Sequence, residues 1–292
     1  MLKRNSLLVS FFFVSLYSVA LETFLTRYFA VTNWAEYGYW IISIVMAGFA
    51  ISGIILSIFE SFFEKYSRIL LSTIPAALIE FTVLGIYCVS VNQFNPLECQ
   101  NEMLWKNQLG NIAKYYLALF PIFFLLGVYI SLIYVRHYRE IGKIYAVNLI
   151  GSAIGSVAML GGMYAVHVFY LPAIIFPLLL VPVFFGVVDQ SAKVKKIIVG
   201  CGLAAFVLAE VYIVFFNTSN FPFYKSITTV LSVEGTKVVK EQSLPDGYFM
   251  VLDDITEFNN TDLSNNYDLL KMSPPPRSLG VYRDGRRVSS LV

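Results

Sequence analysis

Five polar or ionisable residues lie inside long apolar stretches of this chain, where they could carry chemistry: Glu22, Arg27, Glu80, Asn148 and Glu210. A charge in the middle of a bilayer is costly, so such residues are candidates for a function. Glu22 and Arg27 are five residues apart and do not stack on one helical face as an i,i+4 pair would. Two interpretations stay open. The residues are structural ion pairs or interfacial anchors, or the acids converge to relay protons or to bind a polyamine cation.

Asn148 belongs to the segment Tyr145–Gly162, which is built from small residues rather than bulky ones. Four of them recur on one helical face: Gly151, Gly155, Ala158 and Gly162. Small residues at this spacing let two helix backbones approach closely in a membrane, which predicts a helix-packing face. The alternative is that Asn148 lines a polar cavity together with Ser152 and Ser156.

The cysteines and histidines are too few for a metal or haem site made by this chain alone. There are three cysteines and two histidines, with no CxxC pair. Cys88 and Cys99 either pair as a disulfide or stay as free thiols. The sequence also lacks a Walker A loop, a GxGxxG loop, a GxSxG elbow and an HExxH pair, so we expect no cofactor and no catalytic residues. A net charge of +2 gives no indication of nucleic-acid binding.

The elements that position these residues are long apolar helices. The chain has 292 residues, of which 57% are hydrophobic and 14% are charged, whereas soluble domains carry roughly 25% charged residues. A spanning helix needs about 20 apolar residues, and seven stretches qualify: Leu7–Ala30, Tyr37–Phe59, Ile69–Val91, Tyr115–Tyr134, Ile144–His167, Phe169–Val188 and Ile197–Phe216. We therefore predict an all-α polytopic membrane bundle over residues 1–216. The fifth and sixth helices should form a tight hairpin.

Basic residues fall before the first predicted helix and in every second connection after it: Lys3, Arg4, Lys65, Arg68, Arg136, Arg139, Lys143, Lys193, Lys195 and Lys196. Basic loops stay on the cytoplasmic side of a membrane. This pattern predicts a bacterial or archaeal plasma-membrane protein with a cytoplasmic N-terminus and an extracytoplasmic C-terminal tail.

Residues 217–292 differ in composition from the rest and predict a small, mostly β, extracytoplasmic domain. Strands are expected over Ser226–Val233, Gly235–Lys240 and Tyr248–Leu252, with a turn at Pro245-Asp246-Gly247. Leu279–Tyr282 and Arg287–Leu291 should form a hairpin with Asp284-Gly285 at its tip. About 75 residues is close to the lower limit for an independent core, so this domain should lean on the bundle or on a partner.

Several stretches together resemble membrane-embedded spermidine-synthase-like proteins. Glu22-Thr23-Phe24-Leu25-Thr26-Arg27 is similar to that family's E-x-x-W-x-R motif, with Leu25 in place of Trp. Tyr145–Gly162 resembles its Y-x-x-N-x-x-G-x-x-x-G segment. Tyr224-Lys225-Ser226 is similar to its YK element, and Lys237-Val238-Val239 and Gly247-Tyr248 resemble the strands before the synthase domain. The resemblance implies a catalytic Rossmann domain after these strands. This sequence has no counterpart of that domain, so no catalytic residue carries over.

Three functions follow from these observations. The first is a non-catalytic membrane subunit or scaffold, surrounded by lipid, that docks partner proteins through its bundle and its tail. The second is a transporter of a small cation or polyamine. The third is the membrane part of a split aminopropyltransferase-like enzyme completed by another chain. The lack of a catalytic constellation favours the first, and we expect this chain alone not to be an enzyme.

Overall fold

The computed structural model describes residues 2–92, 94–217, 219–254 and 278–291. In these ranges, seven helices are long and apolar enough to span a membrane, which is compatible with an integral membrane protein. They are α1 (Leu2–Thr32), α2 (Gly38–Ile58), α3 (Glu60–Ser90), α4 (Trp105–Arg136), α5 (Ile141–Ala165), α6 (Pro172–Gly186) and α7 (Ala192–Phe215). The predicted bundle is therefore confirmed as seven apolar helices.

Two helices begin well before their apolar stretches. α3 begins at Glu60 rather than near Ile69, and α4 begins at Trp105 rather than near Tyr115. The extra turns are rich in polar and charged residues, which a hydropathy pattern does not count although they are good helix formers. These helices therefore extend past the predicted apolar stretches.

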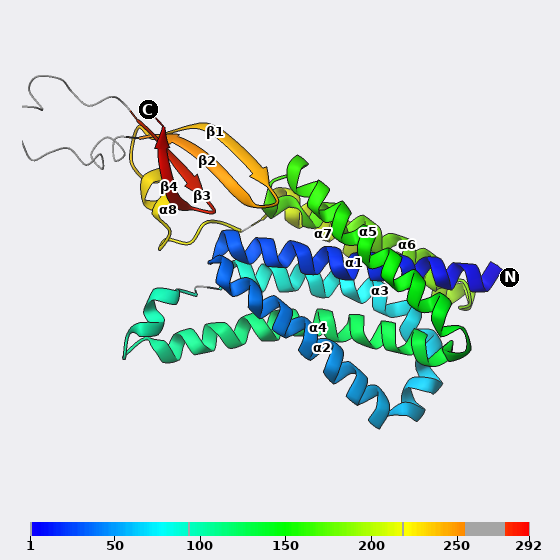
Figure 1. The fold of residues 1–292 in the computed structure, drawn as a ribbon. Coiled ribbons are helices and arrows are strands. Elements are labelled where there is room, and N and C mark those ends of the chain that lie inside the picture. The colour runs from blue at the N-terminus through cyan, green and yellow to red at the C-terminus, as the bar shows by residue number, and fades with distance from the viewer. Residues whose placement is uncertain (1, 93, 218, 255–277, 292) are drawn as a thin grey trace, which may run out of the picture.

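The connections alternate between the two ends of the bundle (Figure 1). The N-terminus lies at the same end as the α2–α3, α4–α5 and α6–α7 connections, and the small sheet lies at the opposite end. The basic segments of the sequence belong to the first of these ends. Because basic loops favour the cytoplasmic side of a membrane, this arrangement is consistent with an extracytoplasmic sheet. The orientation itself stays a prediction.

α1 is the central helix, and it packs against both α5 and α6. Its buried side chains are mostly large and apolar, including Phe11, Tyr17, Phe24 and Phe29. α5 approaches it through glycines. A Cβ atom on Gly155 would come within 2.2 Å of the Leu16 carbonyl oxygen, so no larger residue fits without moving a helix.

The predicted tight hairpin of the fifth and sixth helices needs a correction. α5 and α6 are joined by the short turn at Val168–Tyr170, but each packs chiefly on α1 rather than on the other. His167 lies just before this turn and caps it, because its side chain accepts a hydrogen bond from the Phe169 N–H. The short connection was predicted correctly, whereas the pairing of the helices was not.

The tail forms a four-stranded antiparallel sheet in the order β1-β2-β3-β4: β1 (Lys237–Leu244), β2 (Gly247–Asp253), β3 (Leu279–Arg283) and β4 (Arg286–Leu291). The turn before Gly247 and the hairpin with Asp284-Gly285 at its tip are both confirmed. Asp284 has a φ of +51° and Gly285 a φ of +78°, the left-handed backbone that a two-residue Asp-Gly hairpin turn requires.

The strand predicted over Ser226–Val233 is wrong, because this segment contains the short helix α8 (Ser226–Leu231). Its β-branched residues favour a strand by propensity, but Ile227 and Val230 are three residues apart and both are buried. The Ile227 N–H donates to the Gly285 carbonyl at 3.2 Å. Tertiary contact with the hairpin therefore overrides the local preference.

Candidate functional site

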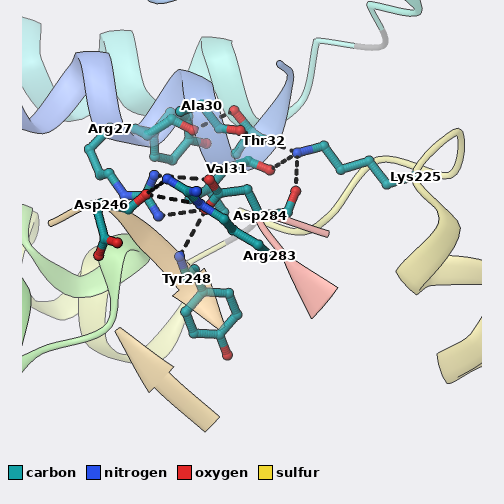
Figure 2. A network of polar contacts seen from close by, with 10 residues as sticks. Arg27, Ala30, Val31, Thr32, Lys225, Asp246, Tyr248, Arg283 and Asp284 are labelled. Atoms are coloured by element: carbon teal, nitrogen blue, oxygen red, sulfur yellow. Dashed lines mark hydrogen bonds and ion pairs between the residues drawn. The ribbon is translucent and has the colours of Figure 1, made fainter. Parts of the chain in front are cut away.

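The sheet and the bundle are held together by an ion pair between α1 and the β3–β4 hairpin (Figure 2). Arg27 Nη2 and Nη1 lie 2.5 and 3.1 Å from the two carboxylate oxygens of Asp284. The side chains are only 9% and 18% exposed. Such a two-point guanidinium–carboxylate contact fixes orientation as well as distance.

Asp284 is also tied to the neighbouring strand. Its Oδ1 accepts a hydrogen bond from the Tyr248 N–H at 2.9 Å, and its own N–H donates to the Tyr248 carbonyl at 2.8 Å. The backbone of β2 thus helps to hold the carboxylate in the position where it contacts Arg27.

Lys225 completes this cluster. Its ammonium group donates to the carbonyls of Ala30 and Val31 in the last turn of α1, and to the Asp284 carbonyl at 2.6 Å. The last carbonyls of a helix lack partners within the helix and carry partial negative charge, so a cation there is favourable. Burial nevertheless lowers the pKa of Lys225 to about 7. We call Arg27, Lys225, Tyr248 and Asp284 the charged junction.

A second contact between sheet and bundle surrounds His167, in the turn between α5 and α6. The imidazole ring packs edge-on against Tyr248, with 4.4 Å between ring centres, and its Nε2 lies 3.9 Å from Glu241 of β1. Its Nδ1 accepts from the Phe169 N–H at 3.1 Å, which places the ring proton of the neutral form on Nε2. Burial lowers the pKa of His167, because it disfavours the charged form.

Beside the charged junction, a cavity of about 370 Å³ lies between the segment 220–223 and the ends of α1, α3 and α4 that are nearest the sheet (Figure 1). We call it the polar chamber. Asn33, Asn92 and Tyr115 line it, and Asn33 is 2% exposed. Tyr28 closes one side by a 2.9 Å hydrogen bond between its hydroxyl and that of Ser219.

Of the five predicted site residues, Arg27 is the one that the structure places in the charged junction. Glu22, a neighbour in α1, is half-buried, Glu80 is exposed, and Glu210 is half-buried. Glu22, Glu80 and Glu210 lie on three different helices, α1, α3 and α7, and no ion pair or hydrogen bond joins them within the described residues. Asn148 is half-buried beside the Tyr134 hydroxyl of α4.

The small residues of α5 are divided between two environments. Gly151 and Gly155 are buried against α1, whereas Gly162 is half-buried beside Leu171 and Ile174 near the α5–α6 turn. Ala158 is exposed, and the buried row of the helix instead continues through Met159 and Met163. The buried row on this part of α5 is therefore spaced by four residues, whereas the predicted row alternates spacings of four and three residues.

Cys88 and Cys99 are free thiols in the structure. Among the described residues, no group of three or more His, Cys, Asp and Glu side chains is arranged to hold a metal ion.

Asp284, Lys225 and Asn33 are the important residues that sequence reasoning missed as site residues. The sequence indicated a role for Asp284 only as a turn residue, and it indicated Lys225 only as part of a Tyr-Lys dipeptide. A sequence cannot indicate that either meets α1, because about 200 residues or more separate them from it.

No family model, no curated protein and no solved structure matches this chain. The resemblance to membrane-embedded spermidine-synthase-like proteins therefore stays a prediction.

Proposed function

We propose that this chain is a non-catalytic integral membrane subunit that holds its small sheet at one end of the bundle as a docking platform for a partner protein. The observation that supports the proposal is the charged junction. Its charged groups are bonded within the protein: Arg27 to Asp284, and Lys225 to three carbonyls. Each of these three groups is therefore bonded to the described part of the chain itself.

The cost of burying these charges also supports a structural role. A buried ion pair is weak evidence for stability, since desolvation can exceed the Coulomb attraction. Such pairs can instead favour one arrangement of two packed elements over other arrangements. Here the geometry that they fix is the position of the sheet relative to α1.

The sheet offers two outer strands. In the described residues, β1 and β4 each have a strand neighbour on one side only. Val239 on β1 and Val288 on β4 are 55% and 61% exposed. An outer strand can bind an extended segment of another protein through main-chain hydrogen bonds. With the cytoplasmic N-terminus predicted above, this platform lies outside the cytoplasm.

Site-specific photo-crosslinking in the native membrane tests the proposal. A photoreactive residue at Val239 or at Val288 should give one adduct of defined mass, and the same residue at lipid-facing Leu208 should not. Arg27→Met, which releases the sheet, should abolish the adduct while the bundle stays folded. The proposal fails if neither outer strand gives an adduct, or if the purified chain alone takes up a polyamine into liposomes.

A further inference from the structure

The polar chamber differs from the charged junction because it contains buried polar atoms without a partner. Asn33 Oδ1 accepts from the Tyr224 hydroxyl at 3.0 Å, whereas its buried Nδ2 has only a weak contact with the Tyr115 hydroxyl and no well-formed hydrogen bond within the described residues. Asn92 Nδ2 donates to the Asn111 carbonyl at 2.8 Å, and Asn92 Oδ1 likewise has no partner. Most buried polar groups in proteins are hydrogen-bonded, so an exception calls for an explanation.

Asn33 and Asn92 line the same cavity. The Tyr115 hydroxyl lies beside both Asn33 and Asn92, and all three residues line the chamber. The unpartnered Asn33 Nδ2 is a donor and the unpartnered Asn92 Oδ1 is an acceptor. A hydroxyl or a carboxamide is the kind of group that satisfies both at once.

The chamber adjoins a larger cavity of about 850 Å³ between α3 and α4, which we call the vestibule. Both cavities are lined by Val91, Asn92 and Phe223. The far part of the vestibule is lined by apolar side chains of membrane-spanning helices, including Leu84 and Leu117, which are 53% and 75% exposed. An apolar, exposed surface on such helices is suited to contact lipid chains.

The polar end of the vestibule is already satisfied. Glu98 accepts from the side-chain amides of Asn95 at 3.1 Å and Gln108 at 2.7 Å. Lys114 donates to the Asn111 side chain at 3.0 Å. Glu98 and Lys114 are the two charged residues in the described lining of the two cavities, and their charges are opposite. The cavities therefore present no net charge to a ligand.

We propose that the chamber and the vestibule bind an amphiphile with an uncharged head that both donates and accepts hydrogen bonds. The head lies in the chamber against Asn33, Asn92 and Tyr115, and the apolar chain lies in the vestibule between α3 and α4. Taken separately, the vestibule of about 850 Å³ and the chamber of about 370 Å³ each have the volume of a small-molecule pocket.

Equilibrium dialysis of the full-length protein, held in amphipol, tests this assignment. The probe is radiolabelled decyl β-D-glucoside below its critical micelle concentration, compared with decyltrimethylammonium and decyl phosphate. We expect saturable binding of one glucoside per chain, at least tenfold tighter than the binding of either charged probe.

Two variants test the two parts of the site, each with a matched control. Asn33→Asp keeps the acceptor for Tyr224 but replaces the unpartnered donor, and Ala118→Leu fills the vestibule. Each should weaken glucoside binding at least tenfold. Asn101→Asp, at a surface turn, and Ala113→Leu, on an exposed part of α4, should stay within twofold of the wild type.

Non-saturable binding, or equal affinity in the variants and the controls, would overturn the proposal. Equal binding of a charged probe would overturn the assignment of an uncharged head. If Asn33→Asp does not fold, the wild-type stoichiometry and Ala118→Leu still decide the outcome.

Discussion

The charged junction and the polar chamber lie next to each other at the sheet end of α1, yet their buried polar groups differ in whether they have hydrogen-bond partners. In the junction, Arg27, Lys225 and Asp284 bond one another or backbone carbonyls. In the chamber, one amide nitrogen and one amide oxygen have no partner in the described residues. The contrast separates a structural role from a binding role. In the proposals made above, the satisfied groups hold the sheet on α1, and the unpartnered amide atoms bind the head of the ligand.

Breaking the junction should have the largest effect. Arg27→Met removes one partner and leaves Asp284 largely buried without its counter-charge, which is expected to cost about 3–5 kcal/mol of unfolding free energy. Chemical unfolding of the purified protein measures it. Arg139→Met, in the connection between α4 and α5, is the control and should change stability by less than about 0.5 kcal/mol. Equal losses in both variants would mean that the pair has no special role.

Lys225 makes the junction sensitive to pH. Its folded-state pKa is about 7, below the value of about 10.4 for an unfolded lysine. Between these values the unfolded chain binds more protons, so stability should rise with pH by about 1 kcal/mol per unit from pH 7.5 to 9. This slope should be absent from Lys225→Met when unfolding is measured across that window. A parallel pH dependence in both proteins would assign the effect to another group.

Tyr28 lines the polar chamber, and its hydroxyl forms a hydrogen bond with the hydroxyl of Ser219. Tyr28→Phe removes one buried hydroxyl, and we expect a loss of about 1 kcal/mol, the usual net value for a neutral hydrogen bond. Ser219→Ala should give a similar loss, and the double variant should cost less than the sum of the two. Strict additivity, measured by the same unfolding assay, would show that the two hydroxyls are not coupled.

The chamber should tolerate change best. Asn33→Leu removes a buried amide that satisfies only one of its two polar atoms, so the lost bond to Tyr224 is offset by relief of the unpartnered nitrogen. We expect a change below about 1 kcal/mol in either direction. A loss as large as that of Arg27→Met would place Asn33 among the structural residues and remove the contrast between the two regions.

The sequence predicts the helices and strands of this fold well, but it predicts the contacts between them poorly. Seven apolar stretches predict seven helices because the length and the composition of a spanning helix are local properties. The Asp284-Gly285 turn is likewise local, since its left-handed backbone favours those residues. The partner of Arg27 lies 257 positions away, and nothing in the spacing of charges within a helix indicates it.

The same limit explains the errors. α8 is helical because Ile227 and Val230 are buried against other parts of the tail, which outweighs their strand propensity. α5 pairs with α1 rather than with α6, because the glycines that allow a close approach fit the backbone near Leu16. Ala158 was expected on the packing face of α5, but it is exposed, and Met159, four residues after Gly155, is buried instead.

The most direct test of the account is the distance between sheet and bundle, measured by electron–electron double resonance with Cys88, Cys99 and Cys201 replaced by serine. Spin labels at Val288 of β4 and Tyr39 of α2, both exposed, should give one narrow distance distribution in the otherwise wild-type protein. Arg27→Met should broaden it, and Arg139→Met should not. A distribution that is broad in the wild type, or that stays narrow in Arg27→Met, would contradict the claim that the charged junction fixes the sheet.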